Sequence, residues 1–303
     1  MKENSTTLLL RLFACPYLII NIFLADHVFI SKDVVLQVVY LIVFLIRFVY
    51  IGNRMNFSVC IDSVFQGMDS VSAMEHVKAA GFGAFEFWMW QNRDIDAMAA
   101  KARELGLSCV CLCTRFFDLA NPGNRETFLS GIADSIPVAK KMNAPFLITQ
   151  SGNDTGAVRP FQHRSVVEGL KSAAPMLEKS GVTLLLEPLN GKINHPGIFL
   201  ESSDEGFEII REVSSPNVKL LFDIYHQQIT EGDVVRRMTS NIDCIGHIHC
   251  AGNPGRHELD SGELDYRRIL AALERAGYKG WAGIEYFPLQ PALEGLKRLK
   301  GII

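Results

Sequence analysis

From Met55 to the end of the chain, short apolar runs alternate with longer amphipathic stretches. The short runs have the length of buried strands, and the stretches between them repeat apolar residues at helical spacing. This alternation is typical of βαβ units around a parallel sheet. The predicted strands are Phe57–Ile61, Ala84–Trp88, Ser108–Thr114, Phe146–Gln150, Thr183–Glu187, Lys219–Asp223, Cys244–His249 and Gly283–Tyr286. Predicted helices between them include Ser72–Ala80, Ile95–Leu105, Arg125–Lys141, Ser165–Lys179 and Tyr266–Ala276.

Glycines follow several predicted helices, as at Gly106 and Gly181, where a helix commonly ends. Eight strands with intervening helices in a span of about 250 residues predict a closed (β/α)₈ TIM barrel. An open doubly wound sheet is the alternative, and it favours a glycine-rich phosphate loop after the first strand. The residues after that predicted strand, Asp62-Ser-Val, supply no such loop. We therefore expect one α/β barrel domain over residues 55–303.

Residues 1–54 form an apolar N-terminal extension of different character. The run Val34–Ile51 has 18 residues and is near the lower limit for a membrane-spanning helix. One interpretation is a membrane hairpin or anchor attached to the predicted barrel; the other is a mis-called start, with translation beginning at Met55. We favour the second, because the first barrel strand follows Met55 at once. The expected location is then the cytoplasm, and membrane association is expected only if residues 1–54 are genuine.

Composition narrows the class of protein further. The formal net charge is −3 and charged residues make up 21% of the chain, with no basic run for a nucleic acid. Cys109, Cys111 and Cys113 alternate in one apolar segment and are expected on one strand face, as buried thiols in a reducing compartment. A metal site made of these cysteines is the less favoured alternative. This composition is ordinary for a soluble enzyme, and small-molecule substrates are the partners expected from the candidate site residues below.

Four consecutive predicted strands each carry a carboxylate or an imidazole at the carboxyl end, where the active sites of such barrels lie. They are Glu187, Asp223, His249 and Glu285, separated by 36, 26 and 36 residues, about one βα unit each. Neighbouring strands lie about 4.8 Å apart, so the four side chains can converge. A single carboxylate here is often a helix cap, but four together predict a divalent metal site. The oxygen-rich set favours Mn²⁺ or Mg²⁺, with Zn²⁺ or Co²⁺ as possible substitutes.

Nearby residues are candidates for contacts with a substrate. His226 lies three residues after Asp223 and is expected either to reach a substrate oxygen or to cap the next helix. Arg256 follows a Gly-Asn-Pro-Gly turn and is expected to bind an anionic group. His247 is expected to point away from the metal into packing. For Glu86, a structural role and a substrate contact remain equally open.

The segments LLLEPLN, FDIYHQQ, GHIH, NPGRHE followed by SGELDY, and GIEY together resemble the hydroxypyruvate isomerase family, part of the xylose isomerase-like barrel superfamily. The resemblance spans residues 55–303 and leaves residues 1–54 without a counterpart. It implies a metal site from the four strand-end residues, proton transfer by Glu187 and Glu285, and substrate contacts by His226 and Arg256. Some family members carry glutamine in place of His249, and the histidine is more similar to the epimerases.

The expected reaction is proton transfer between the adjacent carbons of an α-hydroxy-carbonyl compound, such as hydroxypyruvate and tartronate semialdehyde. The cationic Arg256 favours an oxo acid over a neutral ketose. A ketose 3-epimerase is the main alternative on the same site. An endonuclease-like trinuclear zinc barrel and a non-catalytic, membrane-anchored binding protein are less favoured. A homo-oligomer is possible, but no residue identifies an interface.

Overall fold

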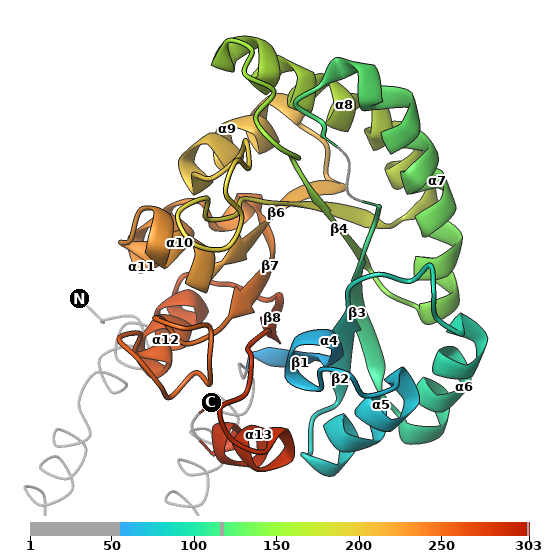
Figure 1. The fold of residues 1–303 in the computed structure, drawn as a ribbon, viewed down its shortest axis with the longest axis vertical. Coiled ribbons are helices and arrows are strands. Elements are labelled where there is room, and N and C mark those ends of the chain that lie inside the picture. The colour runs from blue at the N-terminus through green and yellow to red at the C-terminus, as the bar shows by residue number, and fades with distance from the viewer. Residues whose placement is uncertain (1–54, 116–117, 302) are drawn as a thin grey trace, which may run out of the picture. The chain divides into compact units, whose positions relative to one another are not determined.

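The computed structural model describes residues 55–115, 118–301 and 303. Eight parallel strands form a closed barrel in which each strand pairs with the next and the eighth pairs with the first (Figure 1). The predicted (β/α)₈ fold is confirmed. The strands are β1 Asn56–Cys60, β2 Ala84–Phe87, β3 Ser108–Cys113, β4 Phe146–Gln150, β5 Thr183–Glu187, β6 Val218–Asp223, β7 Ile245–Cys250 and β8 Trp281–Ile284.

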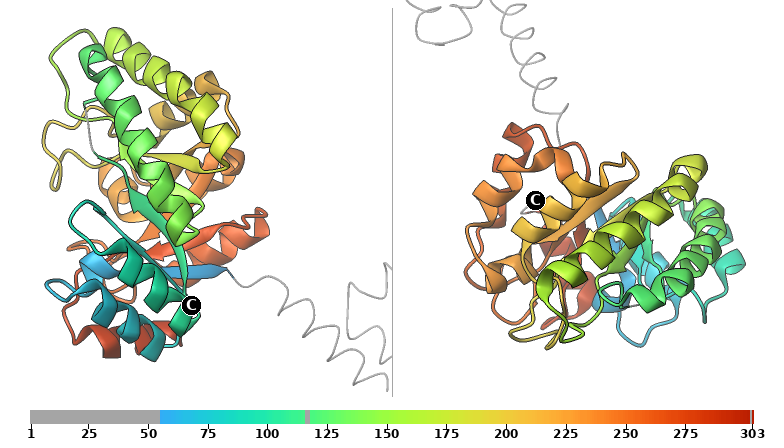
Figure 2. Two further views of the ribbon diagram at one scale, coloured as in Figure 1. Left: turned by 90° about the vertical axis from the view of Figure 1, so that its right-hand side faces the viewer. Right: turned by 90° about the horizontal axis from the view of Figure 1, so that it is seen from above.

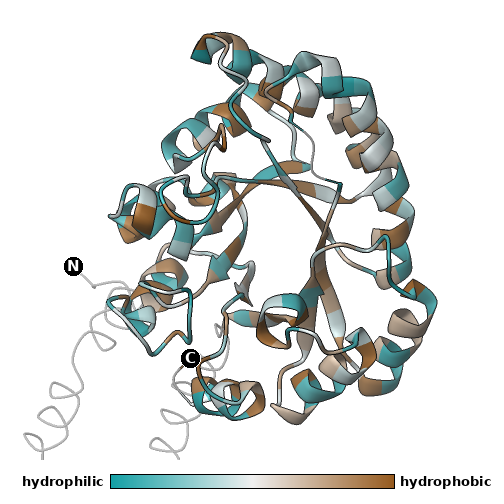
Figure 3. Ribbon diagram, in the orientation of Figure 1, coloured by the Kyte–Doolittle hydropathy of each residue, from teal (hydrophilic) through white to brown (hydrophobic). Residues whose placement is uncertain are grey.

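Helices surround the barrel in these views (Figures 1 and 2). Hydrophobic and hydrophilic segments alternate along the helices in Figure 3, as expected where one side of a helix packs on the strands. The helices are α4 Ile61–Val64, α5 Ser70–Ala79, α6 Ile95–Leu105, η1 Pro122–Asn124, α7 Arg125–Met142, α8 Arg159–Ser180, α9 Ser203–Val213, α10 Ile224–Thr230, α11 Val234–Ser240, η2 Ile242–Cys244, α12 Tyr266–Arg275 and α13 Ala292–Lys300.

Local chemistry sets the ends of these helices. The Asp94 side chain accepts a hydrogen bond from the backbone of Ala97 and caps the start of α6, which ends at Gly106 in the left-handed conformation. Helix α8 begins six residues before the predicted Ser165, because Pro160 lies in its first turn, where the missing N–H costs nothing. The predicted strands agree with the structure to within about two residues, which is the usual uncertainty of element ends.

The prediction for the three cysteines was wrong in one respect. Cys111 and Cys113 pack with Leu185 in one small cluster, whereas Cys109 belongs to the larger hydrophobic core. The cause is an irregularity in the pairing of β2 with β3, whose register shifts between Phe85 and Phe87. An extra residue in one strand reverses the alternation of side chains between its faces. All three thiols are buried and free.

The apolar extension, residues 1–54, lies outside the described residues, so its two interpretations remain predictions. Among residues 55–115, 118–301 and 303, the structure contains no helix that is both long and apolar enough to span a membrane.

Candidate active site

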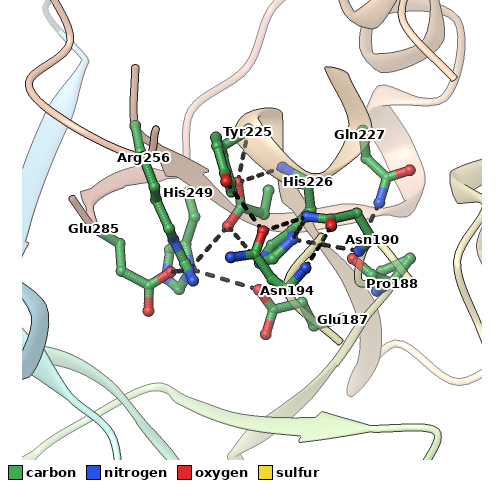
Figure 4. Close-up of polar contacts among 12 residues, drawn as sticks. Glu187, Pro188, Asn190, Asn194, Tyr225, His226, Gln227, His249, Arg256 and Glu285 are labelled. Atoms are coloured by element: carbon green, nitrogen blue, oxygen red, sulfur yellow. Dashed lines mark hydrogen bonds and ion pairs between the residues drawn. The ribbon is translucent and has the colours of Figure 1, made fainter. Parts of the chain in front are cut away.

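Four strand ends bring their side chains to one point at the carboxyl end of the barrel, and Figure 4 shows three of these residues, Glu187, His249 and Glu285. Glu187 and Asp223 are the last residues of β5 and β6, His249 lies in β7, and Glu285 directly follows β8. One ligand atom from each residue lies within 4.8 Å of those of the other three. All four side chains are buried, with exposed fractions between 1% and 6%. The residues predicted from the strand ends are therefore assembled in one cluster.

The donor atoms of this cluster are suited to a divalent cation. Nδ1 of His249 lies 3.2 Å from Oε2 of Glu285 and 3.8 Å from Oε1 of Glu187. It is buried and makes no hydrogen bond to any described residue. Buried polar atoms normally have a partner, so an unpaired nitrogen facing carboxylates fits a metal ligand. Three carboxylates and one imidazole match the ligands of Mn²⁺ and Mg²⁺ sites and tolerate Zn²⁺.

Asp223 caps a helix with one carboxylate oxygen and presents the other oxygen to the cluster. Its Oδ1 accepts hydrogen bonds from the backbone N–H groups of Tyr225 (2.8 Å) and His226 (3.2 Å), which caps helix α10. Its Oδ2 faces the cluster, 3.6 Å from Nε2 of His226 and 3.5 Å from Nη2 of Arg256. The helix cap fixes the side chain, so Oδ2 is directed into the site before any ligand binds.

Arg256 is buried beside the carboxylates and is not a solvated surface residue. Its Nη2 donates to Oε2 of Glu285, and its guanidinium lies between the rings of Tyr225 (5.5 Å) and Phe287 (5.6 Å). The backbone at Arg256 has a φ of 58°, a strained conformation that is often retained at functional sites. Its buried Nε has no hydrogen-bond partner among the described residues. This N–H of the guanidinium group therefore remains available to an anionic ligand.

The proton on His226 can be placed from its neighbours. Nδ1 faces two N–H donors of Asn190, the side-chain amide at 2.5 Å and the backbone at 3.3 Å, so it acts as an acceptor. The neutral ring then carries its proton on Nε2. Burial lowers the pKa of His226 to about 4, which keeps the ring neutral near pH 7. Nε2 has no hydrogen-bond partner among described residues and points toward Asp223, where it can donate to a substrate oxygen.

Trp88 was not predicted as a site residue, but it contacts the cluster. It directly follows β2, and its Nε1 donates a hydrogen bond of 2.6 Å to Oε1 of Glu285. The only signal in the sequence is a large aromatic residue at a strand end, which is ambiguous between packing and function. Trp88 thus holds one oxygen of Glu285 while Arg256 holds the other.

As predicted, His247 is buried in packing and lies away from the four-residue cluster, although its side chain projects into the barrel and not to the opposite face of the strand. Residues two apart in a strand face the same side, so His247 and His249 both project inward from β7. Nε2 of His247 lies 3.0 Å from Oε2 of Glu86, and Nε2 of His249 lies 3.0 Å from Oε1 of the same carboxylate. Glu86 is almost fully buried. It lies behind His249, on the side away from the four-residue cluster.

The two glutamates of the cluster have opposite electrostatic surroundings. Burial raises the pKa of Glu187 to about 7, and the nearby His249 only partly offsets this effect. Burial also raises the pKa of Glu285, but the charges of Arg256 and His249 outweigh it and hold that pKa well below its usual value. A pair of carboxyl groups with separated pKa values is characteristic of acid–base sites.

Comparisons with known proteins indicate the family of this chain. Residues 74–302 match the family model described as xylose isomerase-like TIM barrel. Hydroxypyruvate isomerase of Escherichia coli is 30% identical over 80% of this chain and 97% of its own length. A protein named 2-oxo-tetronate isomerase from Cupriavidus necator is 45% identical over 60% of this chain and 70% of its own length.

A solved structure shares the fold over nearly all of the described region. The crystal structure described as AP endonuclease, family 2 from Brucella melitensis superposes with a TM-score of 0.78 and 29% identity, covering 82% of this chain and 99% of that one. The fold, the assembled site and the sequence matches lead to one conclusion. This chain is an isomerase that belongs to the xylose isomerase-like TIM barrel family, and within it to the hydroxypyruvate isomerase family.

Proposed function

We propose that this isomerase moves a proton between the adjacent carbons of a small 2-oxo-3-hydroxy acid, with hydroxypyruvate and tartronate semialdehyde as the interconverted pair. The observation that carries the proposal is the convergence of Glu187 and Glu285 with Asp223 and His249, beside the buried Arg256. Two carboxylates supply the acid and base, and a buried cation suits a substrate carboxylate.

Substrate binding is assigned to two residues that border the cluster. Arg256 holds the substrate carboxylate through the part of its guanidinium that makes no contact with Glu285. His226 donates from Nε2 to a substrate oxygen, with the proton position fixed by Asn190. A neutral donor suits this role, because it stabilises the negative charge that develops on oxygen and stays protonated throughout.

Proton transfer is assigned to the two glutamates. One of Glu187 and Glu285 removes a proton from C3 of hydroxypyruvate, and the electron pair forms the C2–C3 double bond of an enediolate. The same residue or its partner returns a proton to C2, and the C3 hydroxyl proton moves to the C2 oxygen, which gives tartronate semialdehyde. Fixed orientation of Glu285 by Trp88 keeps this carboxylate at one place during both steps.

Glu187, Asp223, His249 and Glu285 would hold a divalent ion, with Mn²⁺ or Mg²⁺ favoured by the oxygen donors. When bound, such an ion supplies Lewis-acid stabilisation of negative charge on the substrate oxygens.

A four-carbon substrate is a second candidate, because the relative with the highest identity among those compared above is named 2-oxo-tetronate isomerase. The same residues can act on it, since it also carries a carboxylate next to the reacting carbons. A ketose 3-epimerase remains the alternative that lacks this carboxylate. An endonuclease with three zinc ions is disfavoured, because β2, β3 and β4 end near Trp88, Thr114 and Gln150 and not in histidine or glutamate.

The proposal is tested by following hydroxypyruvate and 2-oxo-tetronate separately by NMR, with residues 55–303 and the full chain, in the presence of Mn²⁺ or Mg²⁺. We expect product formation that Glu285→Gln abolishes. A folded, metal-loaded protein that converts neither acid but epimerises a ketose would reject the oxo-acid substrate.

A further inference from the structure

Behind the candidate metal site, a second buried polar cluster crosses the barrel interior. Its centre is Glu86 of β2, and its other members are Ser58 of β1, Cys111 of β3 and His247 of β7. Oε2 of Glu86 accepts from Ser58 Oγ (2.8 Å) and Cys111 Sγ (3.3 Å), and lies 3.0 Å from Nε2 of His247. From the sequence alone, a structural role and a substrate contact were equally open for this carboxylate. Burying a carboxylate costs several kcal/mol, so its retention in a barrel core calls for a reason.

The other oxygen of Glu86 faces His249. Oε1 lies 3.0 Å from Nε2 of His249. The two atoms are in contact, but neither has a hydrogen-bond partner among the described residues. On the opposite side of the same ring, Nδ1 faces Glu285 and Glu187. The imidazole therefore lies between one carboxylate behind and two carboxylates in front.

Strand β8 leaves room for this contact. Gly283 pairs with His249 across the β7–β8 ladder. A Cβ at position 283 would lie 2.3 Å from Oε1 of Glu86 and 2.7 Å from Cδ2 of His249. Any side chain there would displace one of the two groups. The contact between Glu86 and His249 therefore requires glycine at position 283.

We propose that Glu86 is a positioning residue that fixes the proton of His249 on Nε2 and directs its Nδ1 lone pair at the metal. This inference rests on the proposed metal site. A carboxylate accepts but does not donate, so the 3.0 Å contact with Oε1 favours the proton of the neutral ring on Nε2, and Nδ1 is left to coordinate. Metal-bound histidines commonly have such a partner, whose removal typically lowers metal affinity about 10- to 100-fold.

The test compares Mn²⁺ binding by calorimetry in the unaltered full chain, Glu86→Gln and Ser58→Ala. Glu86→Gln should weaken binding about 10- to 100-fold. Ser58→Ala is the matched control, because it removes a donor to Oε2 and leaves the contact between Oε1 and His249. It should change Mn²⁺ affinity less than about twofold, whatever its effect on thermal unfolding of the metal-free protein.

A second measurement needs no variant. Long-range ¹H–¹⁵N NMR of the Mg²⁺-loaded chain should show His249 protonated at Nε2 and unprotonated at Nδ1. Protonation at Nδ1 would overturn the proposal, as would unchanged Mn²⁺ affinity in folded Glu86→Gln. A calorimetric stoichiometry of two Mn²⁺ ions per chain that Cys111→Ser reduces to one would also overturn it. The second buried polar cluster around Glu86 would then bind a metal ion itself. An unaltered chain that binds no metal would instead reject the metal site of the proposed function.

Discussion

Trp88 and Glu285 are 197 residues apart in the sequence, yet the indole Nε1 of Trp88 donates a hydrogen bond of 2.6 Å to the carboxylate of Glu285. The strands that carry them are not neighbours, since β1 pairs with both β2 and β8 and lies between them. The indole therefore passes over the end of β1 to reach the carboxylate. A carboxylate held in this way keeps the orientation that proton transfer requires.

Trp88→Phe keeps the ring and removes the donor. A hydrogen bond to a charged group contributes about 1.5–3 kcal/mol, so we expect kcat to fall about 10- to 100-fold. Trp90→Phe is the matched control, because its Nε1 donates to Ser135 Oγ, away from the four-residue cluster. Steady-state kinetics with hydroxypyruvate check this, and equal kinetics in the two variants would contradict a role for Trp88.

Arg256→Lys keeps the positive charge but loses the planar fork that binds a carboxylate through two nitrogens. We expect the KM for hydroxypyruvate to rise about tenfold or more, the amount that corresponds to roughly 1.4 kcal/mol. The partly exposed ion pair of Arg237 with Asp204 offers a control, and Arg237→Lys should leave KM unchanged. If Arg256→Lys alters neither KM nor kcat, the carboxylate is bound elsewhere.

Gly283→Ala adds a methyl group that would meet Glu86 and His249 at 2.3 and 2.7 Å. Overpacking of a buried site typically costs about 1–3 kcal/mol, so the free energy of unfolding should fall by this amount in urea. Gly83→Ala is the control, since a Cβ there would meet no atom within 4 Å. Comparable loss in both variants would show that the effect arises from glycine replacement in general.

His163 lies outside the active site and is expected to make a pH-dependent contribution to the free energy of unfolding. Burial lowers its pKa, but hydrogen bonds with Glu205 (2.9 Å) and Glu212 (3.0 Å) outweigh this and raise it. Because the folded pKa lies above the unfolded value of about 6.5, the stabilisation is complete below that pH and is lost as pH rises through the folded pKa.

His163→Gln should therefore lower the free energy of unfolding more at about pH 6 than at about pH 9. Urea unfolding at the two pH values measures the difference. A destabilisation that is equal at both, or larger at the higher pH, would contradict this account.

The sequence predicted the barrel and the four-residue cluster because both depend on local patterns. Glu187 and Asp223 each follow several apolar residues, so the position of the strand end and the direction of the side chain can be inferred together. The barrel geometry then brings adjacent strand ends together without further information.

The remainder of the site depends on contacts between distant strands. Trp88 and Glu86 act through side chains that reach across the barrel, and no local pattern indicates their partners. The inward direction of His247 could have been predicted, since it lies two residues from His249 on the same strand. The position of Cys109 could not, because it depends on an irregularity in strand pairing.

We propose that Glu187 and Glu285 transfer a carbon-bound proton of the substrate at a metal-dependent site. The most direct measurement is deuterium incorporation from D₂O into hydroxypyruvate, followed by NMR in chelator-treated protein before and after Mn²⁺ is added. We predict exchange only after Mn²⁺ addition, and its loss in both Glu187→Gln and Glu285→Gln. Equal exchange in the chelated protein, or undiminished exchange in the two variants, would contradict the claim.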